Sequence, residues 1–142
     1  MEFSILGKPK AQARHRSFKR GKFSGIYDPS AKDKKTFLEM AMFFIGRLPN
    51  NVPYDEPIKV TIFFFFNRPK ADYRTGKFSG ELKDSVANLH MGRKPDIDNL
   101  QKFVFDALNK IFWRDDSLIA EVHCYKAYAK IARTEIVIET IL

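Results

Sequence analysis

Four aspartates and one lysine lie close together in the second half of a chain that is otherwise basic. In chain order they are Asp96, Asp98, Lys102, Asp115 and Asp116. Carboxylate oxygens suit Mg²⁺ or Mn²⁺ as ligands, and not zinc or copper. The residue types and their spacing therefore predict a divalent-cation site, of the kind that hydrolyses phosphodiester bonds.

The spacing leaves several readings of these residues open. Asp96 and Asp98 could simply cap a helix, because Asp98 with Gln101 makes an acceptable capping box. Lys102 lies on the same helix face as Asp98, where it could stabilise charge on phosphorus or form an ordinary surface pair. A helix of about a dozen residues separates its ends by roughly 20 Å. Asp116 can therefore reach Asp96 only if the chain folds back or the following strand returns alongside.

The composition predicts a single domain over residues 1–142 and a polyanionic partner. The chain carries 25 Lys and Arg against 17 Asp and Glu, a net charge of +8, and 44% hydrophobic residues. This balance favours nucleic acid over an anionic membrane surface, although a small basic protein can also be merely soluble. The single cysteine, Cys124, excludes an internal disulfide and a cysteine-based zinc site. With no signal peptide and no apolar run beyond five residues, 62–66, we expect a cytoplasmic protein without membrane contact.

A basic segment from Lys8 to Tyr27 is the first candidate for DNA contact. It contains no acidic residue before Asp28, and Phe18, Phe23 and Tyr27 lie between its charges. Rings can stack on bases while cations pair with phosphates, although a charge run is often only a solvated face. The predicted DNA-binding residues are Lys8, Lys10, Arg14, Arg16, Lys19, Arg20 and Lys22, together with Arg93 and Lys94 beside the acidic cluster.

The hydrophobic pattern predicts an α+β fold: a single small domain with a mixed sheet packed against two main helices, in the order β-α-β-α-β-β. The expected strands cover residues 3–6, 58–67, 118–130 and 134–141, and the expected helices cover about 31–48 and 99–112. The second strand contains four consecutive phenylalanines, typical of a central strand covered on both faces. The polar segment 68–93 is expected to be a flap that becomes ordered on substrate.

The first predicted helix has two notable features. Ser30 is a plausible N-cap, with Asp33 three residues later in a capping-box position. The predicted core stripe consists of Phe37, Ala41, Phe44 and Leu48. Further apolar residues make the helix hydrophobic nearly all round, which indicates a subunit interface.

Residues 94–109, KPDIDNLQKFVFDALN, and 113–119, WRDDSLI, resemble the signature of the RusA family. These endodeoxyribonucleases resolve Holliday junctions and are often encoded by phages and prophages. The resemblance implies that Asp96, Asp98 and Asp116 are the catalytic, metal-binding carboxylates, with Asp115 as their neighbour, and that Lys102 is the essential lysine. It also implies Mg²⁺, with Mn²⁺ as a possible substitute, held by these carboxylates with Asp115 as a further metal ligand, and a homodimer that makes paired symmetric nicks in recombination and repair. Asp116 would meet the helix start across the dimer or through the returning strand.

Three other functions compete with this one. A non-catalytic basic DNA-binding module would use the same basic segment, with the aspartates as caps. A nuclease with the same chemistry could instead act on flaps, forks or single strands. A purely structural interaction protein would not bind DNA in a salt-dependent way.

Overall fold

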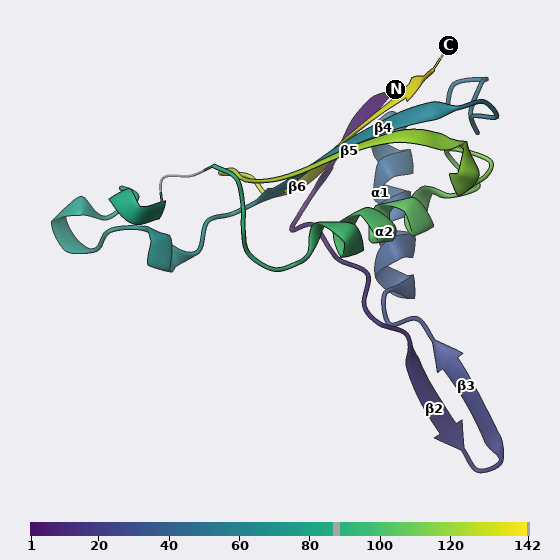
Figure 1. The fold of residues 1–142 in the computed structure, drawn as a ribbon, viewed down its shortest axis with the longest axis horizontal. Coiled ribbons are helices and arrows are strands. Elements are labelled where there is room, and N and C mark those ends of the chain that lie inside the picture. Colours follow the sequence, from purple (N-terminus) through teal and green to yellow (C-terminus); the bar gives the residue numbers. More distant parts are fainter. Residues whose placement is uncertain (87–88, 142) are drawn as a thin grey trace.

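The structure is a computed structural model that describes residues 1–86 and 89–141. Its main elements are β1 (Glu2–Leu6), β2 (Arg16–Arg20), β3 (Phe23–Tyr27), α1 (Ala31–Ile45), β4 (Ile58–Phe66), α2 (Ile97–Leu108), β5 (Ile119–Tyr128) and β6 (Arg133–Thr140). A four-stranded sheet has the order β1-β6-β4-β5, in which β4 and β5 are parallel and the other pairs antiparallel (Figure 1). The predicted mixed sheet and element order are confirmed, and β2 and β3 add a hairpin that was not predicted from the sequence.

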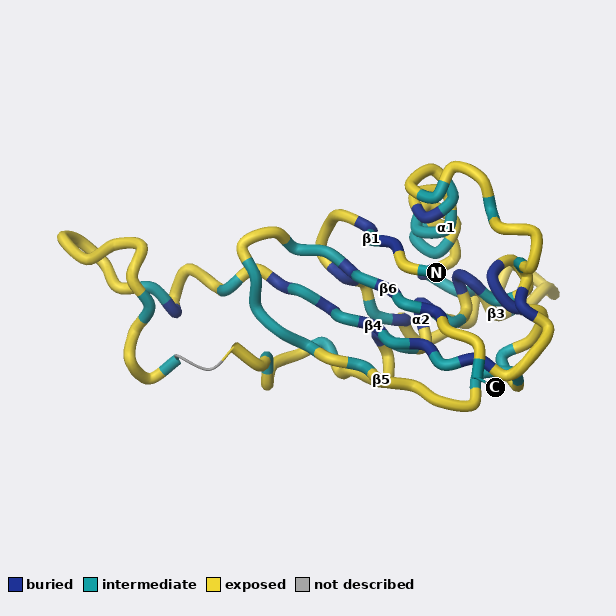
Figure 2. The backbone as a smooth tube through the Cα atoms, turned by 90° about the horizontal axis from the view of Figure 1, so that it is seen from above, coloured by how far each residue is buried: buried dark blue, intermediate teal, exposed yellow. Residues whose placement is uncertain are grey.

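Both helices lie on the same side of the sheet (Figure 1). On β4, alternate residues from Ile58 to Phe66 are buried against them, and the residues between are only half-buried (Figure 2). The prediction of a central strand is confirmed, but in the single chain only one of its faces is covered. On the open face Phe63 stacks on Phe65 and Tyr125, with ring centroids 6.0 and 5.0 Å apart, so the rings shield one another.

The buried stripe of α1 differs from the predicted one. Phe37 and Ala41 face the core as expected, but Phe44 is 60% exposed. The helix also ends at Ile45, three residues before the predicted end, because Gly46 adopts φ 74° and leaves the helical region. The predicted cap is not formed either: Ser30 Oγ accepts a hydrogen bond from the backbone N–H of Ala13 at 3.0 Å instead.

The second helix begins and ends earlier than predicted, at residues 97 and 108 instead of 99 and 112. Its buried face is as expected and consists of Leu100, Phe103, Val104, Ala107 and Leu108. The chain turns out of the helix at Asn109, and Lys110 adopts φ 69°. Ile111, predicted on the same face, is therefore 38% exposed.

Residues 16–27 of the basic segment form a two-stranded hairpin that projects away from the sheet and helices (Figure 1). Gly21, with φ 58°, is the first residue of its two-residue loop, where a positive φ suits the twist of the strands. At its base, Gln12 Nε2 donates to Asp28 Oδ1 at 2.8 Å, and Asp28 also accepts from the Ser30 backbone and Lys34. The direction of the hairpin is therefore fixed at the point where α1 begins.

The clamp around Asp28 predicts a specific dependence of stability on pH. Burial alone would raise the pKa of Asp28, but hydrogen bonds from Lys34, Ser30 and Gln12 outweigh it and lower the pKa from 3.8 to about 2. The clamp therefore stabilises the fold above about pH 4, and this contribution is lost as the pH falls toward 2. Asp28→Asn should reduce the free energy of unfolding in urea most near neutral pH and least near pH 2. An equal loss at both pH values would contradict the clamp.

Among the described residues, no helix combines the length and apolarity that a membrane crossing demands.

Candidate functional site

Asp96 and Asp98 lie at the N-terminus of α2, and neither is used as a cap. Asp96 is the N-cap residue, but its side chain makes no capping hydrogen bond. Asp98 Oδ1 accepts only from the adjacent backbone N–H of Asn99, at 2.9 Å. The expected capping-box partner Gln101 instead accepts from Cys124 Sγ at 3.4 Å. The carboxylates therefore sit at the positive end of the helix dipole, where Asp96 is paired with the exposed side chain of Lys94.

The loop before the two aspartates is held by a lysine from the sheet. Lys126 of β5 donates from Nζ to the backbone carbonyls of Arg93 and Pro95, at 2.8 and 2.9 Å. This fixes the loop against the end of β5 and so orients the start of α2. Nothing in the sequence around Lys126 indicates this role, because its two partners are backbone atoms about thirty residues away.

A buried carboxylate ties the long polar segment to the same loop. Asp72 is 3% exposed, and its two carboxylate oxygens accept hydrogen bonds from Nη2 and Nη1 of Arg93 at 2.7 and 2.9 Å. Nη1 of Arg68 lies 3.5 Å from the same carboxylate. The hydrogen bonds from Arg93 lower the pKa of Asp72. Arg93 also donates to Tyr128 Oη at 3.2 Å. Arg93 is predicted to bind DNA, but in the structure its guanidinium group joins the start of the polar segment, at Asp72, to the loop before Asp96.

Asp115 and Asp116 lie at the opposite end of α2. Asp116 Oδ1 accepts from the indole N–H of buried Trp113 at 2.7 Å. Asp115 Oδ1 accepts from the backbone N–H of Ser117 at 2.9 Å, and hydrogen bonding by Ser117 lowers the pKa of Asp115. Asp115 thus caps the short turn that precedes β5, whereas Asp116 is anchored through one oxygen only.

The returning strand does not join Asp116 to Asp96 within one chain. β5 starts just after Asp116 and runs back along α2 to Lys126, which contacts the loop of Asp96. Seven residues of strand between Ile119 and Lys126 correspond to about 23 Å. Over residues 1–86 and 89–141, no three potential metal ligands of the His, Cys, Asp or Glu type come together. Within the described part of a single chain, the returning strand therefore does not assemble the three carboxylates.

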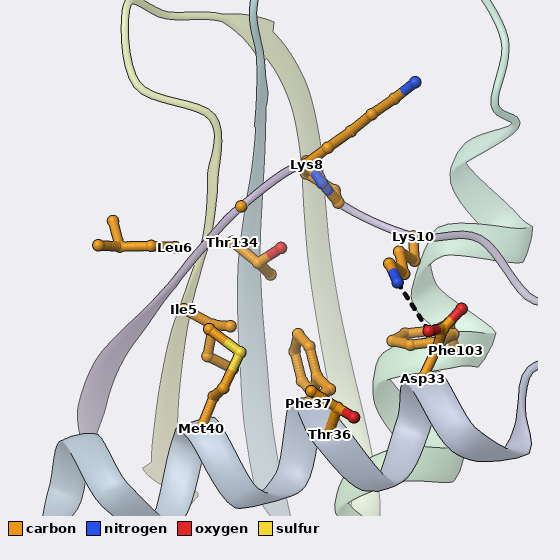
Figure 3. A pocket seen from close by; sticks show the side chains of 12 residues that line it. Ile5, Leu6, Lys8, Lys10, Asp33, Thr36, Phe37, Met40, Phe103 and Thr134 are labelled. Atoms are coloured by element: carbon orange, nitrogen blue, oxygen red, sulfur yellow. Dashed lines mark hydrogen bonds and ion pairs between the residues drawn. The ribbon is translucent and has the colours of Figure 1, made fainter.

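The predicted DNA-binding residues are spread over three places. Those of the hairpin, Arg16, Lys19, Arg20 and Lys22, are all exposed. Lys8 points away from a cavity of about 180 Å³ between β1 and α1, whereas Lys10 is paired with Asp33 at 2.7 Å (Figure 3). Lys94 Nζ lies 2.9 Å from the Asp96 carboxylate. Because this ion pair is exposed to solvent it is weak, so Lys94 can leave Asp96 to contact DNA. The cavity itself has mainly apolar walls and lies apart from Asp96.

Comparison with known proteins identifies the family of the chain. Residues 7–139 match the family model described as Endodeoxyribonuclease RusA, which is nearly the whole chain. The chain is also 29% identical to the uncharacterized protein YqaN of Bacillus subtilis (strain 168), over 99% of this chain and 96% of that protein. The protein therefore belongs to the RusA family, the endodeoxyribonucleases that resolve Holliday junctions.

Proposed function

We propose that the chain hydrolyses phosphodiester bonds of four-way DNA junctions with a divalent cation, as a homodimer that makes paired symmetric nicks. The observation that supports this best is the state of Asp96 and Asp98. Both lie at the helix start, neither caps it, and Lys126 holds the loop before them. A purely structural helix N-terminus would be expected to use these carboxylates as caps.

The residues at the helix start fit a hard cation. Asp96 and Asp98 offer carboxylate oxygens only, which is the donor set that Mg²⁺ prefers and Mn²⁺ accepts. When bound, the cation supplies an activated water and stabilises charge on the leaving oxygen. We assign the third carboxylate to Asp116 in preference to Asp115, because Asp115 is already occupied as a turn cap. Asp115 then acts by shaping the turn that presents Asp116.

Lys102 is the proposed electrostatic partner of the reacting phosphate. It lies one helical turn after Asp98 and is exposed on α2. An ammonium group at this position can stabilise negative charge that develops on the phosphoryl oxygens. Lys102 does not need to move a proton for this role.

Asp116 reaches the acidic pair if a second copy of the chain supplies it. β5 is the outer strand of the four-stranded sheet; near its end Ala127 forms a bridge with His90, whereas residues 120–123 are exposed. Two copies related by a two-fold axis would pair these edges antiparallel, so that the start of one β5 lies beside the end of the other. Asp116 precedes the start of β5, and Asp96 lies beside its end. Each site would then contain Asp96 and Asp98 from one copy and Asp116 from the other.

The outer face of α1 is the alternative interface that the sequence predicts. Phe43 is 91% exposed there and Met40 is 40% exposed. A two-fold axis through α1 and β1, however, would leave the two β5 strands at opposite outer edges. Such a dimer would not bring Asp116 to Asp96, so we favour the β5 edge for completion of the site.

Cations around the site would hold the DNA backbone. We propose that Lys8, Arg14 and Lys94 contact phosphates near the acidic loop, together with the hairpin cations Arg16, Lys19, Arg20 and Lys22. Lys10 and Arg93 can do so only in addition to their ion pairs with Asp33 and Asp72. Phosphate contacts of this kind position the substrate and give binding a steep dependence on salt.

Competition between substrates tests the proposal. With Mg²⁺ present, a labelled four-way junction should be cut in the presence of an excess of flap, fork or linear duplex DNA. Preferred cutting of flaps or forks would assign a different branched substrate. Binding without cleavage, with Mn²⁺ also tried, would favour a non-catalytic DNA-binding module.

Lys126→Met should raise the Mg²⁺ concentration needed for half-maximal cleavage without unfolding the protein. The change removes both hydrogen bonds that hold the acidic loop, and loss of such support typically costs about 10- to 100-fold in metal affinity or activity. The measurement is the Mg²⁺ concentration that gives half-maximal cleavage. Lys130→Met, in the exposed turn after the same strand, is the control. Equal Mg²⁺ dependence in the two variants would contradict the role of Lys126.

A further inference from the structure

The β2–β3 hairpin separates its side chains onto two unlike faces. Cross-strand pairs in an antiparallel hairpin share a face, and faces alternate along each strand. The pairs on the first face are Arg16 with Tyr27, Phe18 with Gly25, and Arg20 with Phe23. The pairs on the opposite face are Ser17 with Ile26 and Lys19 with Ser24. All three aromatic rings and two arginines of the hairpin therefore lie on the first face, which we call the aromatic face.

The aromatic face is open to solvent. Phe23 is 80% exposed, and Phe18 and Tyr27 are each 45% exposed. The rings of Phe18 and Tyr27 have centroids 6.3 Å apart. Rings left this exposed cost free energy in water unless a partner covers them.

Gly25 makes the arrangement of the rings possible. A Cβ atom at this position would lie 2.7 Å from the ring of Phe18, which is closer than real contacts allow. The ring of Phe18 therefore lies across the neighbouring strand, over the backbone of Gly25. Any larger residue at position 25 would push the ring off this place.

The chain at the base of the hairpin that carries the aromatic face is tied to the helix start that carries the acidic pair. The backbone N–H of Gln12, just before the hairpin, donates to the carbonyl of Asn99 at 2.9 Å, and Asn99 is the residue after Asp98. The other end of the hairpin is clamped through Asp28 to the start of α1. A ligand on this face would therefore have a fixed relation to the proposed cleavage site.

The chemistry of the face selects one kind of ligand. Between residues 16 and 27 there are four cations and no acid, so the complementary charge is that of a polyanion. Exposed rings between cations suit nucleobases, which stack on the rings while phosphates pair with the cations. Bases inside a duplex have their faces covered by neighbouring bases, so they cannot stack on these rings. Unpaired bases can.

We propose that the aromatic face of the β2–β3 hairpin is a binding site for unpaired DNA bases, which stack on Phe18, Phe23 and Tyr27. The inference rests on the proposed action on branched DNA, because branch points are where unstacked bases arise beside paired arms. It goes further, since it assigns recognition of the open branch to a surface that is separate from the metal-binding carboxylates.

The test uses the full chain in EDTA, so that binding is measured without cleavage. The two probes are a fully paired duplex and the same duplex with a short bulge of unpaired thymines. Wild type should bind the bulged DNA more tightly, and Phe18→Ala should lose at least about fivefold of affinity for it. Ile26→Ala, on the opposite face and 75% exposed, is the matched control and should change neither affinity. Gly25→Ala, which displaces the ring of Phe18 but retains it, should lower the affinity for bulged DNA in the same direction by less than Phe18→Ala.

Two further measurements separate stacking from charge and from misfolding. Arg20→Gln should reduce the slope of log affinity against log salt by about one, whereas Phe18→Ala should leave the slope unchanged. In wild type, iododeoxyuridine placed in the bulge should crosslink under ultraviolet light to Phe18 or to the tryptic peptide that begins at Phe23. Equal affinity for bulged and paired DNA, equal effects of Phe18→Ala and Ile26→Ala, or crosslinks only outside the hairpin would each overturn the site. If the wild-type protein cuts four-way junctions but gives any of these three results, the proposed function stands and only the base-binding site on the hairpin is rejected.

Discussion

Asp98→Asn is expected to lower the rate of junction cleavage by about a hundred- to a thousandfold. The amide has nearly the shape of the carboxylate but lacks the negative charge that holds a divalent cation. Binding of the junction should persist, and could tighten slightly, because one negative charge is removed from a site that faces phosphates. The measurement is a single-turnover cleavage rate in Mg²⁺ beside a binding titration in EDTA.

Asp33→Asn is the matched control for this change. Asp33 is the acidic residue in the first turn of α1, as Asp98 is in the first turn of α2. The two substitutions therefore have similar effects on the helix dipole. Asp33 is paired only with the exposed Lys10, so cleavage should remain close to that of wild type. Equal cleavage rates for the Asp98→Asn and Asp33→Asn variants would contradict a role of Asp98 in catalysis.

A mixture of two inactive variants should recover activity if Asp116 acts across the dimer. Asp98→Asn and Asp116→Asn homodimers should both be inactive. A heterodimer of the two would combine both substitutions in one site and leave the other site intact. With random pairing, half of the dimers are heterodimers, so about a quarter of the sites would be functional.

The products of the mixture distinguish the two arrangements. On a plasmid that extrudes a cruciform, paired nicks linearise the circle, whereas one functional site per dimer gives a nicked circle. Co-expressed variants should therefore produce nicked circles, and wild type should produce linear DNA. If purified heterodimer makes no nicks, the third carboxylate must come from the same chain, and the β5-edge dimer would be wrong.

The parts of the fold that the sequence predicts are those governed by local periodicity. The sheet strands and the buried face of α2 follow directly from the spacing of apolar residues. Phe44 shows the limit of this reasoning, because a nearly all-round apolar helix does not reveal which side meets the sheet. The hairpin had a local signal in Gly21-Lys22 between two basic stretches, but charge gave no alternation of apolar residues to mark the strands.

The residues of the candidate site likewise fall into those that local sequence predicts and those that only the folded chain reveals. Asp96, Asp98 and Lys102 are close in sequence, so a helix start must bring them together. The position of Asp116 depends on where β5 begins in the sheet, which no local pattern contains. Lys126 and Asp72 escape prediction because the partners of Lys126 are distant backbone carbonyls and because Arg93, which pairs with Asp72, lies 21 residues along the chain. Long-range polar contacts of this kind become visible only in the folded structure.

Cleavage of a synthetic four-way junction by the wild-type protein tests the central claim most directly. Each of the four strands is end-labelled in turn, and the reaction is followed with Mg²⁺, with Mn²⁺ and in EDTA. We expect nicks at symmetric positions in two strands of like polarity, and only when the cation is present. A protein that binds the junction but leaves all four strands intact with either metal would contradict it.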